Sequence, residues 1–379
     1  MSRLLRFVFT CIVGSTVLLT AAQHLSSSPA WWLELSRFLP FPALLLPALW
    51  ALLLACWLGR GWRVAGAANL ALVATLTMGL EWRTGDTATA TATATGTATA
   101  TDTGTDTSGA LPVRVMTYNV KSYRASQRAG GFDALAREVA LHHPDILVMQ
   151  DAGELPAATF ARRFPLGTAL GYPHLHAAGQ YLVASRFALR DCVESGLGLA
   201  ADAAHYLRCT VEAGGIAVTL VTVHFASPRH GLNAARHEGF DGVDDWQRNL
   251  ADRLAQAAKL AGDLAAAPTP LIVAGDLNAS QSSPVIDTLQ SVGLRDAFVR
   301  AGRGYGYTYG QALRPGFSFL RIDHLLVSAD IGVTRCYAGG AEASEHRPVI
   351  ADLLLRRAVV VPHRPVSARF DTLTAWVGA

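Results

Sequence analysis

Charged residues are scarce in this chain, since aspartate, glutamate, lysine and arginine make up only 16% of its 379 residues. The formal net charge is +3. Residues 1–109 hold six arginines and five acidic residues, which leaves 26 basic and 24 acidic residues in the remainder. A nearly neutral remainder lacks the basic excess that is typical of nucleic-acid-binding proteins, so the composition argues against that class.

Cysteine is also sparse, with five residues and no C-x-x-C pair, which excludes the usual zinc knuckle and dithiol redox motifs. Cys192 and Cys209 flank a predicted turn and can face each other on neighbouring strands. Either a disulfide or two buried thiols fits this spacing, and an extracytoplasmic location would permit the disulfide.

Hydrophobic residues make up 51% of the chain and concentrate in three N-terminal runs, Phe7–Ala22, Phe38–Leu58 and Val64–Leu80. A bilayer crossing needs ~20 apolar residues, so we expect residues 1–83 to form a membrane anchor, with three transmembrane helices. The first run also resembles a cleaved signal peptide. A buried helical hairpin of a soluble protein is the alternative.

The basic residues predict the orientation of this anchor. Arg3 and Arg6 precede the first run, and Arg60 and Arg63 lie between the second and third. The positive-inside rule then places the N-terminus in the cytoplasm and everything after residue 83 outside. With two spans instead of three, the remainder would lie inside.

Residues 84–109 are nearly all threonine, alanine, aspartate and glycine. They offer no large apolar side chain to bury, so we predict a flexible linker between the anchor and a globular domain. Residues 358–379 form a C-terminal tail without a readable pattern.

Residues 110–357 alternate strand-like and helix-like segments, which predicts a layered α/β domain. The predicted strands are Val113–Thr117, Asp145–Met149, Gln180–Ala184, Leu207–Val211, Ile216–Val223, Leu271–Ala274, Ile322–Val327 and Val349–Leu355. The predicted helices are Phe132–His142, Asp245–Leu264 and Pro284–Val292.

Polar side chains gather where these strands end. The stretch Leu271–Ser280 reads as a buried strand that breaks at Gly275 and presents Asp276 and Asn278 beyond its end. Ligands of open α/β sheets bind just past the carboxyl ends of strands. Further amides, carboxylates and imidazoles lie at the ends of other predicted strands: Asn119, Gln150, Asp151, His224, Asp323, Glu345 and His346.

The ordered series MTYNV, PDILVMQD, VTVHF, AGDLNAS, RIDHLLVS and SEHRPV resembles the endonuclease/exonuclease/phosphatase family, over about residues 111–357. The resemblance implies a four-layer α/β sandwich, in which two packed β-sheets are flanked by helices. It also implies hydrolysis of phosphoester bonds with a divalent metal ion, Mg²⁺ or Mn²⁺.

The resemblance assigns roles to single residues. Asp276 would orient and deprotonate the attacking water, and Asn278 would hold that water or a phosphoryl oxygen. His346 would stabilise developing charge while Asp323 fixes its tautomer, and His224 would bind the phosphate from the opposite side. The metal-directed residues are Asp151, Glu345 and Asn119. His324 points to the opposite face of a regular strand and is expected to be structural.

Two positions depart from the family pattern. Asp151 stands where a glutamate is usual, and Glu345 stands where an aspartate is usual. Our hypothesis is a compensated site, in which the metal ion lies closer to Asp151 and Glu345 reaches further. A damaged site that holds metal poorly is the alternative.

The sequence therefore predicts a multi-pass protein of the cytoplasmic membrane with an extracytoplasmic phosphoesterase domain. Its location favours a phosphorylated small-molecule or lipid substrate, either a phosphate ester or a pyrophosphate, at the membrane surface. An extracytoplasmic nuclease acting on DNA or RNA is the competing enzymatic reading. A binding module that has lost catalytic activity is the alternative from a different functional class.

Overall fold

The computed structural model describes residues 2–25, 30–39, 41–86, 110–155, 171–198, 204–238, 241–313 and 316–356. The predicted C-terminal tail lies outside the described residues, as does the predicted linker apart from residues 84–86.

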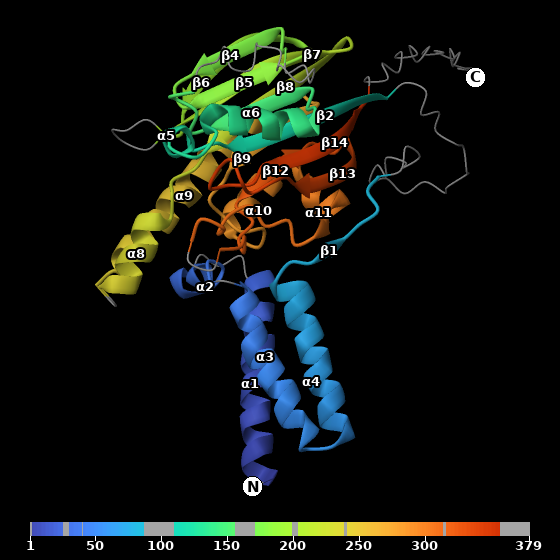
Figure 1. Ribbon diagram of the computed structural model, residues 1–379, viewed down its shortest axis with the longest axis vertical. Coiled ribbons are helices and arrows are strands. Elements are labelled where there is room, and N and C mark those ends of the chain that lie inside the picture. The colour runs from blue at the N-terminus through green and yellow to red at the C-terminus, as the bar shows by residue number, and fades with distance from the viewer. Residues whose placement is uncertain are drawn as a thin grey trace, which may run out of the picture.

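Two six-stranded sheets form the centre of the α/β domain (Figure 1). The first, the β2 sheet, has the order β13-β14-β2-β3-β5-β4, with β2 Leu111–Asn119, β3 Ile146–Gln150, β4 His174–Ala178, β5 Tyr181–Ser185, β13 Gly332–Ala338 and β14 Val349–Leu355. The second, the β9 sheet, has the order β10-β12-β9-β8-β7-β6, with β6 Ala188–Gly196, β7 His205–Ala213, β8 Ile216–His224, β9 Leu271–Asp276, β10 Arg295–Asp296 and β12 Asp323–Val327.

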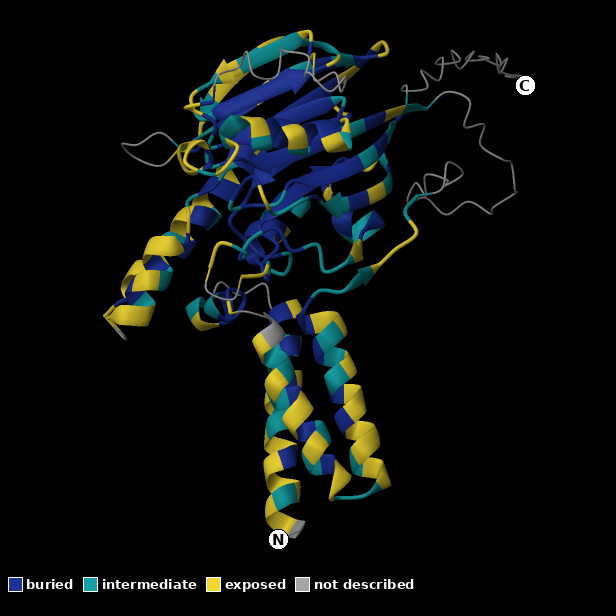
Figure 2. Cartoon of the chain, viewed as in Figure 1, coloured by how far each residue is buried: buried dark blue, intermediate teal, exposed yellow. Residues whose placement is uncertain are grey.

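The two sheets pack face to face because their strands carry apolar side chains on both faces. Along β2, Val113 and Val115 point into the cluster shared with the β9 sheet, whereas Met116 and Tyr118 pack against α6. The helices of the domain are α5 Ser122–Ser126, α6 Gly131–His142, α8 Arg229–His237, α9 Val243–Leu264, α10 Pro284–Gln290 and α11 Ala297–Ala301. Helices α9 and α10 cover the outer face of the β9 sheet. The domain is thus the expected four-layer α/β sandwich, with its buried strands at the centre (Figure 2).

The N-terminal part forms a helical bundle that extends from one end of this domain (Figure 1). Its elements are α1 Ser2–Leu25, α2 Trp31–Ser36, the 3-10 turn Phe41–Leu44, α3 Leu45–Cys56, α4 Arg60–Leu72 and the π-helical turn Val73–Thr77. Of the described helices, α1 alone is long and apolar enough to cross a membrane. The span predicted at residues 38–58 is shorter than expected, because α3 has only 12 residues and reaches ~18 Å.

The bundle packs directly on the α/β domain, which the prediction of a flexible linker did not anticipate. Strand β1, Glu81–Trp82, pairs with β11, Arg303–Gly304. Immediately beyond it, Asp86 pairs with Arg300 and accepts a 2.9 Å hydrogen bond from the Val333 amide. Residues 84–86, which were assigned to the linker, are therefore held against the domain.

Helix α2 makes the second junction between the bundle and the domain. The carboxylate of Glu34 is fully buried and accepts hydrogen bonds from three side chains, Arg37 at 3.1 Å, Arg253 at 3.0 Å and Ser283 at 3.0 Å. The Phe38 ring lies edge-on to Trp246, 5.5 Å between centroids. A buried carboxylate needs such partners, so α2 is fixed to α9 and α10 rather than merely lying beside them.

Cys192 of β6 and Cys209 of β7 form a disulfide, while Cys11, Cys56 and Cys336 are free. We expect the denatured protein to alkylate at three cysteines without reductant and at all five after reduction. Intact mass spectrometry after alkylation counts the modified thiols. Five modified cysteines without reductant would contradict the pairing.

Candidate active site

Strand register brings three of the predicted residues into one row. Strands β8 and β9 are parallel and pair His224 with Asp276, and the antiparallel strand β12 places Asp323 beside Asp276. The predicted break of the strand at Gly275 is wrong, because β9 continues through Gly275 to Asp276. A Cβ atom at Gly275 would lie 1.9 Å from the Val223 carbonyl oxygen, so only glycine lets β8 and β9 approach here.

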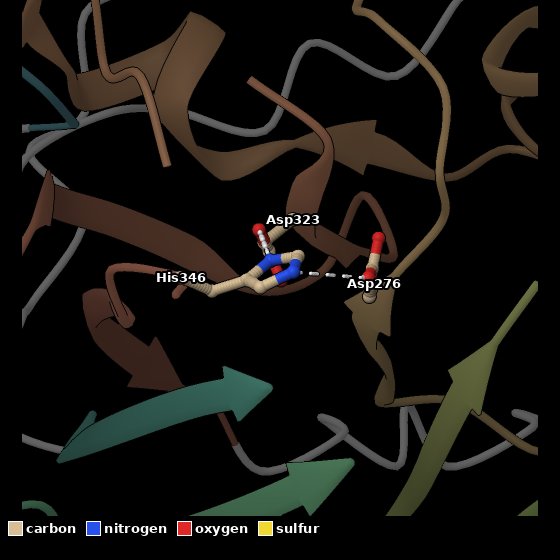
Figure 3. A group of neighbouring side chains, drawn as sticks. All are labelled: Asp276, Asp323 and His346. Carbon is tan, nitrogen blue, oxygen red and sulfur yellow. Dashed lines mark hydrogen bonds and ion pairs between the residues drawn. The ribbon is translucent and has the colours of Figure 1, made fainter. Parts of the chain in front are cut away.

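The facing β2 sheet and the loop before β14 complete the group. Asn119, the last residue of β2, donates a 2.8 Å hydrogen bond from its amide to Asp276 Oδ2. His346 directs Nδ1 toward Asp323 Oδ2 at 2.9 Å and Nε2 toward Asp276 Oδ2 at 3.8 Å (Figure 3). Its loop is held by Ser344, whose hydroxyl donates to the Asn119 carbonyl oxygen at 2.8 Å. The imidazole thus bridges two carboxylates from neighbouring strands.

The charges in this group stabilise one another. Burial raises the pKa of Asp276, but the imidazoles of His346 and His224, the Lys121 ammonium and the Asn119 amide outweigh burial and hold that pKa below its ordinary value. Burial lowers the pKa of His346, yet the Asp323 and Asp276 carboxylates raise it above the ordinary value. The Asp276 carboxylate can accept a hydrogen bond from water, and the His346 imidazole can donate one to a phosphoryl oxygen.

His224 faces Asp276 from the other side. Its Nδ1 lies 2.7 Å from Gln180 Oε1, and its Nε2 lies 3.5 Å from Asp276 Oδ2. An amide oxygen accepts only, so Nδ1 carries the proton that joins His224 to Gln180. Burial lowers the pKa of His224 despite the nearby Asp276. His224 is therefore held in one orientation, with Nε2 facing Asp276.

Backbone strain concentrates at the same place. Lys121, Asp151 and Asn278 follow β2, β3 and β9, and have positive φ angles of 46°, 53° and 47°. Such conformations cost about 1–3 kcal/mol each in residues other than glycine and cluster at functional sites. The strained turn lets the Asn278 amide nitrogen donate to Asp276 Oδ1 at 3.0 Å, and the Asn278 side chain donate to the Phe225 carbonyl oxygen at 2.9 Å.

The carboxylate oxygens of this group fit a hard divalent cation, which prefers oxygen ligands. Ligand atoms of Asp276, Asp323 and His346 lie within 4.8 Å of one another, and all three residues are buried. Asp323 Oδ1 is buried and has no hydrogen-bond partner among the described residues. The predicted metal residue Asn119 joins this group through Asp276.

The other two predicted metal residues, Asp151 and Glu345, lie at the rim of the group around Asp276. The Asp151 carboxylate is 42% exposed and pairs with Lys121 Nζ at 2.9 Å. The Glu345 carboxylate lies 3.6 Å from Arg229 Nη2. Each of these two departures from the family pattern therefore lies beside a basic side chain, either Lys121 or Arg229.

The catalytic group opens into a cavity of about 790 Å³. Asp276, Asn278, Glu345 and His346 line one part of it, together with Lys121 and Arg229. The remaining walls are mostly apolar and come from α8 and from eight further residues: Leu35, Phe38, Leu39, Ala312, Leu313, Phe319, Leu320 and Ile322. Helix α8, which follows His224 in the chain, supplies one of these walls.

His324, beside Asp323, takes no part in this group. Its Nδ1 pairs with Asp296 Oδ2 at 2.9 Å and its Nε2 lies 2.8 Å from the Ala279 carbonyl oxygen. Arg321 also pairs with Asp296, at 2.8 Å. The expected structural role of His324 agrees with these contacts.

The buried ion pairs of Asp296 with Arg321 and His324 make the free energy of unfolding depend on pH. Burial raises the pKa of Asp296, but Arg321 and His324 outweigh it and hold that pKa well below the ordinary value. Such a carboxylate contributes stability above its unfolded pKa of about 4, and the contribution is lost as pH falls through the folded value. We expect Asp296→Asn to lower the free energy of unfolding at pH 7 by about 2 kcal/mol, and the difference from wild type to shrink below pH ~4.

Urea unfolding at pH 7 and pH 3 measures this difference, with kcat as the second readout. Asp296 does not line the cavity, so kcat should stay at the wild-type value. A difference of equal size at both pH values would contradict the linkage.

Sequence reasoning did not single out three residues that contact the site. They are Lys121, which pairs with Asp151, Gln180, which orients His224, and Tyr309, whose ring centroid lies 4.8 Å from that of His346. Gln180 begins a predicted strand and Lys121 follows Asn119 by two residues, so proximity to known motifs was the available signal. Tyr309 lies in an irregular segment without such a signal.

Residues 116–346 match the family model described as Endonuclease/Exonuclease/phosphatase family. An endonuclease/exonuclease/phosphatase family protein from Bacteroides thetaiotaomicron is 18% identical with a TM-score of 0.46, over 65% of this chain and 99% of that one. Truncated TDP2 from Caenorhabditis elegans is 18% identical with a TM-score of 0.47, over 64% and 97%. The mannosyl-6-phosphatase of Bacteroides thetaiotaomicron is 18% identical with a TM-score of 0.43, over 64% and 99%. None of the curated proteins compared with the chain matches it.

Proposed function

The chain belongs to the endonuclease/exonuclease/phosphatase family of divalent-metal-dependent phosphoester hydrolases, and we propose that it hydrolyses a phosphate ester or pyrophosphate at a membrane surface. The observation that carries this proposal is the convergence of Asn119, His224 and His346 on Asp276, from both sheets and a loop. These contacts surround the Asp276 carboxylate with polar side chains, and the Asn119 and His346 donors among them can bind a phosphoryl group.

Mg²⁺ or Mn²⁺ would be held by Asp276 and Asn119 with Asp323 nearby, and Asp151 and Glu345 would act from the rim. The ion, when bound, neutralises charge on the phosphoryl group. Asp276 orients the attacking water and accepts its proton, while Asn278 positions a phosphoryl oxygen. His346, oriented by Asp323, donates a hydrogen bond to the charge that develops, and His224 binds from the opposite side.

The surface of the helical bundle supports a membrane location. Large apolar side chains point outward, among them Phe7, Leu18, Leu53 and Trp57, which are 61–81% exposed. Its interior includes polar contacts between helices, since Thr16 contacts Asn69 at 2.6 Å and Thr20 contacts Thr77 at 2.6 Å. Apolar outer surfaces and polar contacts between helices are typical of membrane bundles. Figure 2 shows the exposed stripes along α1, α3 and α4.

Charge and cysteine chemistry support an extracytoplasmic catalytic domain. The N-terminus and the α3–α4 turn lie at the end of the bundle away from that domain (Figure 1). Arg3, Arg6, Arg60 and Arg63 are placed there by sequence, so the positive-inside rule directs this end to the cytoplasm. The Cys192–Cys209 disulfide suits an oxidising compartment.

Turnover by the full chain in lipid nanodiscs tests this function. Alkyl phosphates, alkyl pyrophosphates, phosphodiesters and single- and double-stranded DNA would be offered with Mg²⁺ or Mn²⁺. A nuclease would cleave DNA, and its affinity for DNA would fall steeply as the salt concentration rises, through counterion release. A binding module without catalysis would turn over none of them. Metal-dependent release of phosphate from an alkyl ester or pyrophosphate supports the proposal, and turnover of DNA alone overturns it.

The compensated-site hypothesis predicts the effect of exchanging the two rim carboxylates. Asp151→Glu and Glu345→Asp are each expected to lower kcat/KM, because each moves one carboxylate by a methylene relative to the other. The double variant is expected to recover most of the activity, and a double-mutant cycle on kcat/KM measures the coupling. Additive losses would show that the two positions act independently.

A further inference from the structure

The cavity beside the catalytic group has a polar part and an apolar part. At the polar part, Lys121 and Arg229 add positive charge near Asp276 and His346. The apolar part is lined by Leu35, Phe38, Leu39, Leu232, Ala235, Leu313, Phe319 and Leu320. A bound phosphate would occupy the polar part alone and leave this apolar wall facing water.

The apolar wall comes from both halves of the protein. Leu35, Phe38 and Leu39 belong to the N-terminal bundle, whereas Leu232 and Ala235 belong to α8. Figure 1 shows α2 and α8 at the end of the catalytic domain that carries the bundle. The cavity thus lies where the bundle meets the domain.

The N-terminal side of the wall is fixed in place. The Arg253 guanidinium lies over the Phe38 ring at 5.2 Å and over the Trp246 ring at 5.4 Å. The Trp246 indole donates to the Trp31 carbonyl oxygen at 2.9 Å. A preformed apolar wall binds an apolar ligand without the entropy cost of ordering its own side chains.

Leu39 and Leu313 also line the cavity and remain 46% and 44% exposed. Apolar side chains left open beside a charged catalytic group favour a ligand with one charged end and a hydrocarbon body. A sugar phosphate would instead require hydrogen-bond partners along these walls, where apolar side chains predominate.

We propose that this cavity binds the hydrocarbon chain of an amphiphilic phosphate, with its phosphate at Asp276 and His346. The proposal rests on the proposed function and narrows its substrate to esters or pyrophosphates of a long-chain alcohol. It also makes residues 35–39 of the membrane anchor part of the substrate site.

The test uses the full chain in nanodiscs and n-alkyl phosphates and pyrophosphates from ethyl to decyl. Burial of each methylene strengthens binding about fourfold, so kcat/KM should rise steeply with chain length until the cavity is filled. Ala235→Trp fills the cavity and should flatten this dependence, as should Leu39→Gln at the half-exposed mouth. Ala258→Trp, on the exposed face of α9, is the matched control and should retain it.

The outcomes separate this proposal from the function on which it rests. Hydrolysis of ethyl and decyl substrates with equal kcat/KM would overturn the cavity proposal and leave phosphoester hydrolysis intact. A chain-length dependence that survives in both folded cavity variants would come from partition into the bilayer and would also overturn it. If no ester or pyrophosphate is hydrolysed, the proposed function itself is overturned.

Discussion

Replacement of Asp276 by asparagine is expected to lower kcat by about 10²–10⁴-fold, the usual contribution of a general base. The change removes the negative charge on which Asn119, His224 and His346 converge, while it preserves the shape of the side chain. Asp276 Oδ1 also accepts the Asn278 amide at 3.0 Å, so the strained turn after β9 depends on the same carboxylate.

Steady-state kinetics of the full chain measures this loss, with circular dichroism as the check on folding. Asp252→Asn on the exposed face of α9 is the matched control and should keep wild-type kcat. An Asp276→Asn protein that is folded and retains a kcat within a factor of two would show that water is activated elsewhere.

Glu34→Ala is expected to lower the free energy of unfolding by about 3–5 kcal/mol, because it leaves a buried charge network without its anion. Arg37 and Arg253 are both fully buried, and each makes an ion pair with Glu34. Arg253 also donates to the Asn278 carbonyl oxygen at 2.8 Å. The loss of Glu34 therefore reaches the catalytic turn as well as the junction between bundle and domain.

Urea unfolding in nanodiscs, followed by tryptophan fluorescence, measures the change. Glu81→Ala is the control, since its pair with Arg83 is exposed on the arginine side and should contribute less than about 1 kcal/mol. The double variant Glu34→Leu, Arg253→Leu should be more stable than Glu34→Ala, because no unpaired guanidinium remains at position 253. A Glu34→Ala protein with wild-type stability would contradict the junction described here.

This junction changes how the chain divides into working parts. The sequence places a boundary near residue 110, and a fragment beginning there would include the sandwich. Such a fragment would lack Glu34, the partner of Arg253, and the cavity wall formed by Leu35, Phe38 and Leu39. Assays therefore require the full chain.

The central strands and most of the site could be predicted because their signals are local. Strands β2, β3, β9 and β14 are apolar runs buried on both faces, and the polar residues at their ends follow from chain order. Strands β4, β6 and β13 were missed because each lies at or near an edge of its sheet and alternates weakly between buried and exposed residues. These three strands leave many of their side chains partly or fully exposed, so their hydrophobic signal is weak.

The junction and the cavity could not be predicted, because they depend on residues far apart in the chain. Glu34 and Arg253 are separated by 219 positions, and each alone is typical of a solvent-exposed helix. The Thr/Ala-rich segment between them suggested separation rather than contact. Compositional evidence for a linker therefore says nothing about whether the segments on its two sides pack together.

The measurement that tests the central claim most directly is the metal dependence of turnover. The full chain in nanodiscs would be stripped with a chelator, assayed on decyl phosphate and decyl pyrophosphate, and then titrated with Mg²⁺ or Mn²⁺. We predict that the stripped protein is inactive and that either ion restores saturable turnover, which Asp276→Asn lacks. Turnover that persists unchanged after chelation, or that never appears with either ion, would contradict a metal-dependent phosphoesterase site at Asp276.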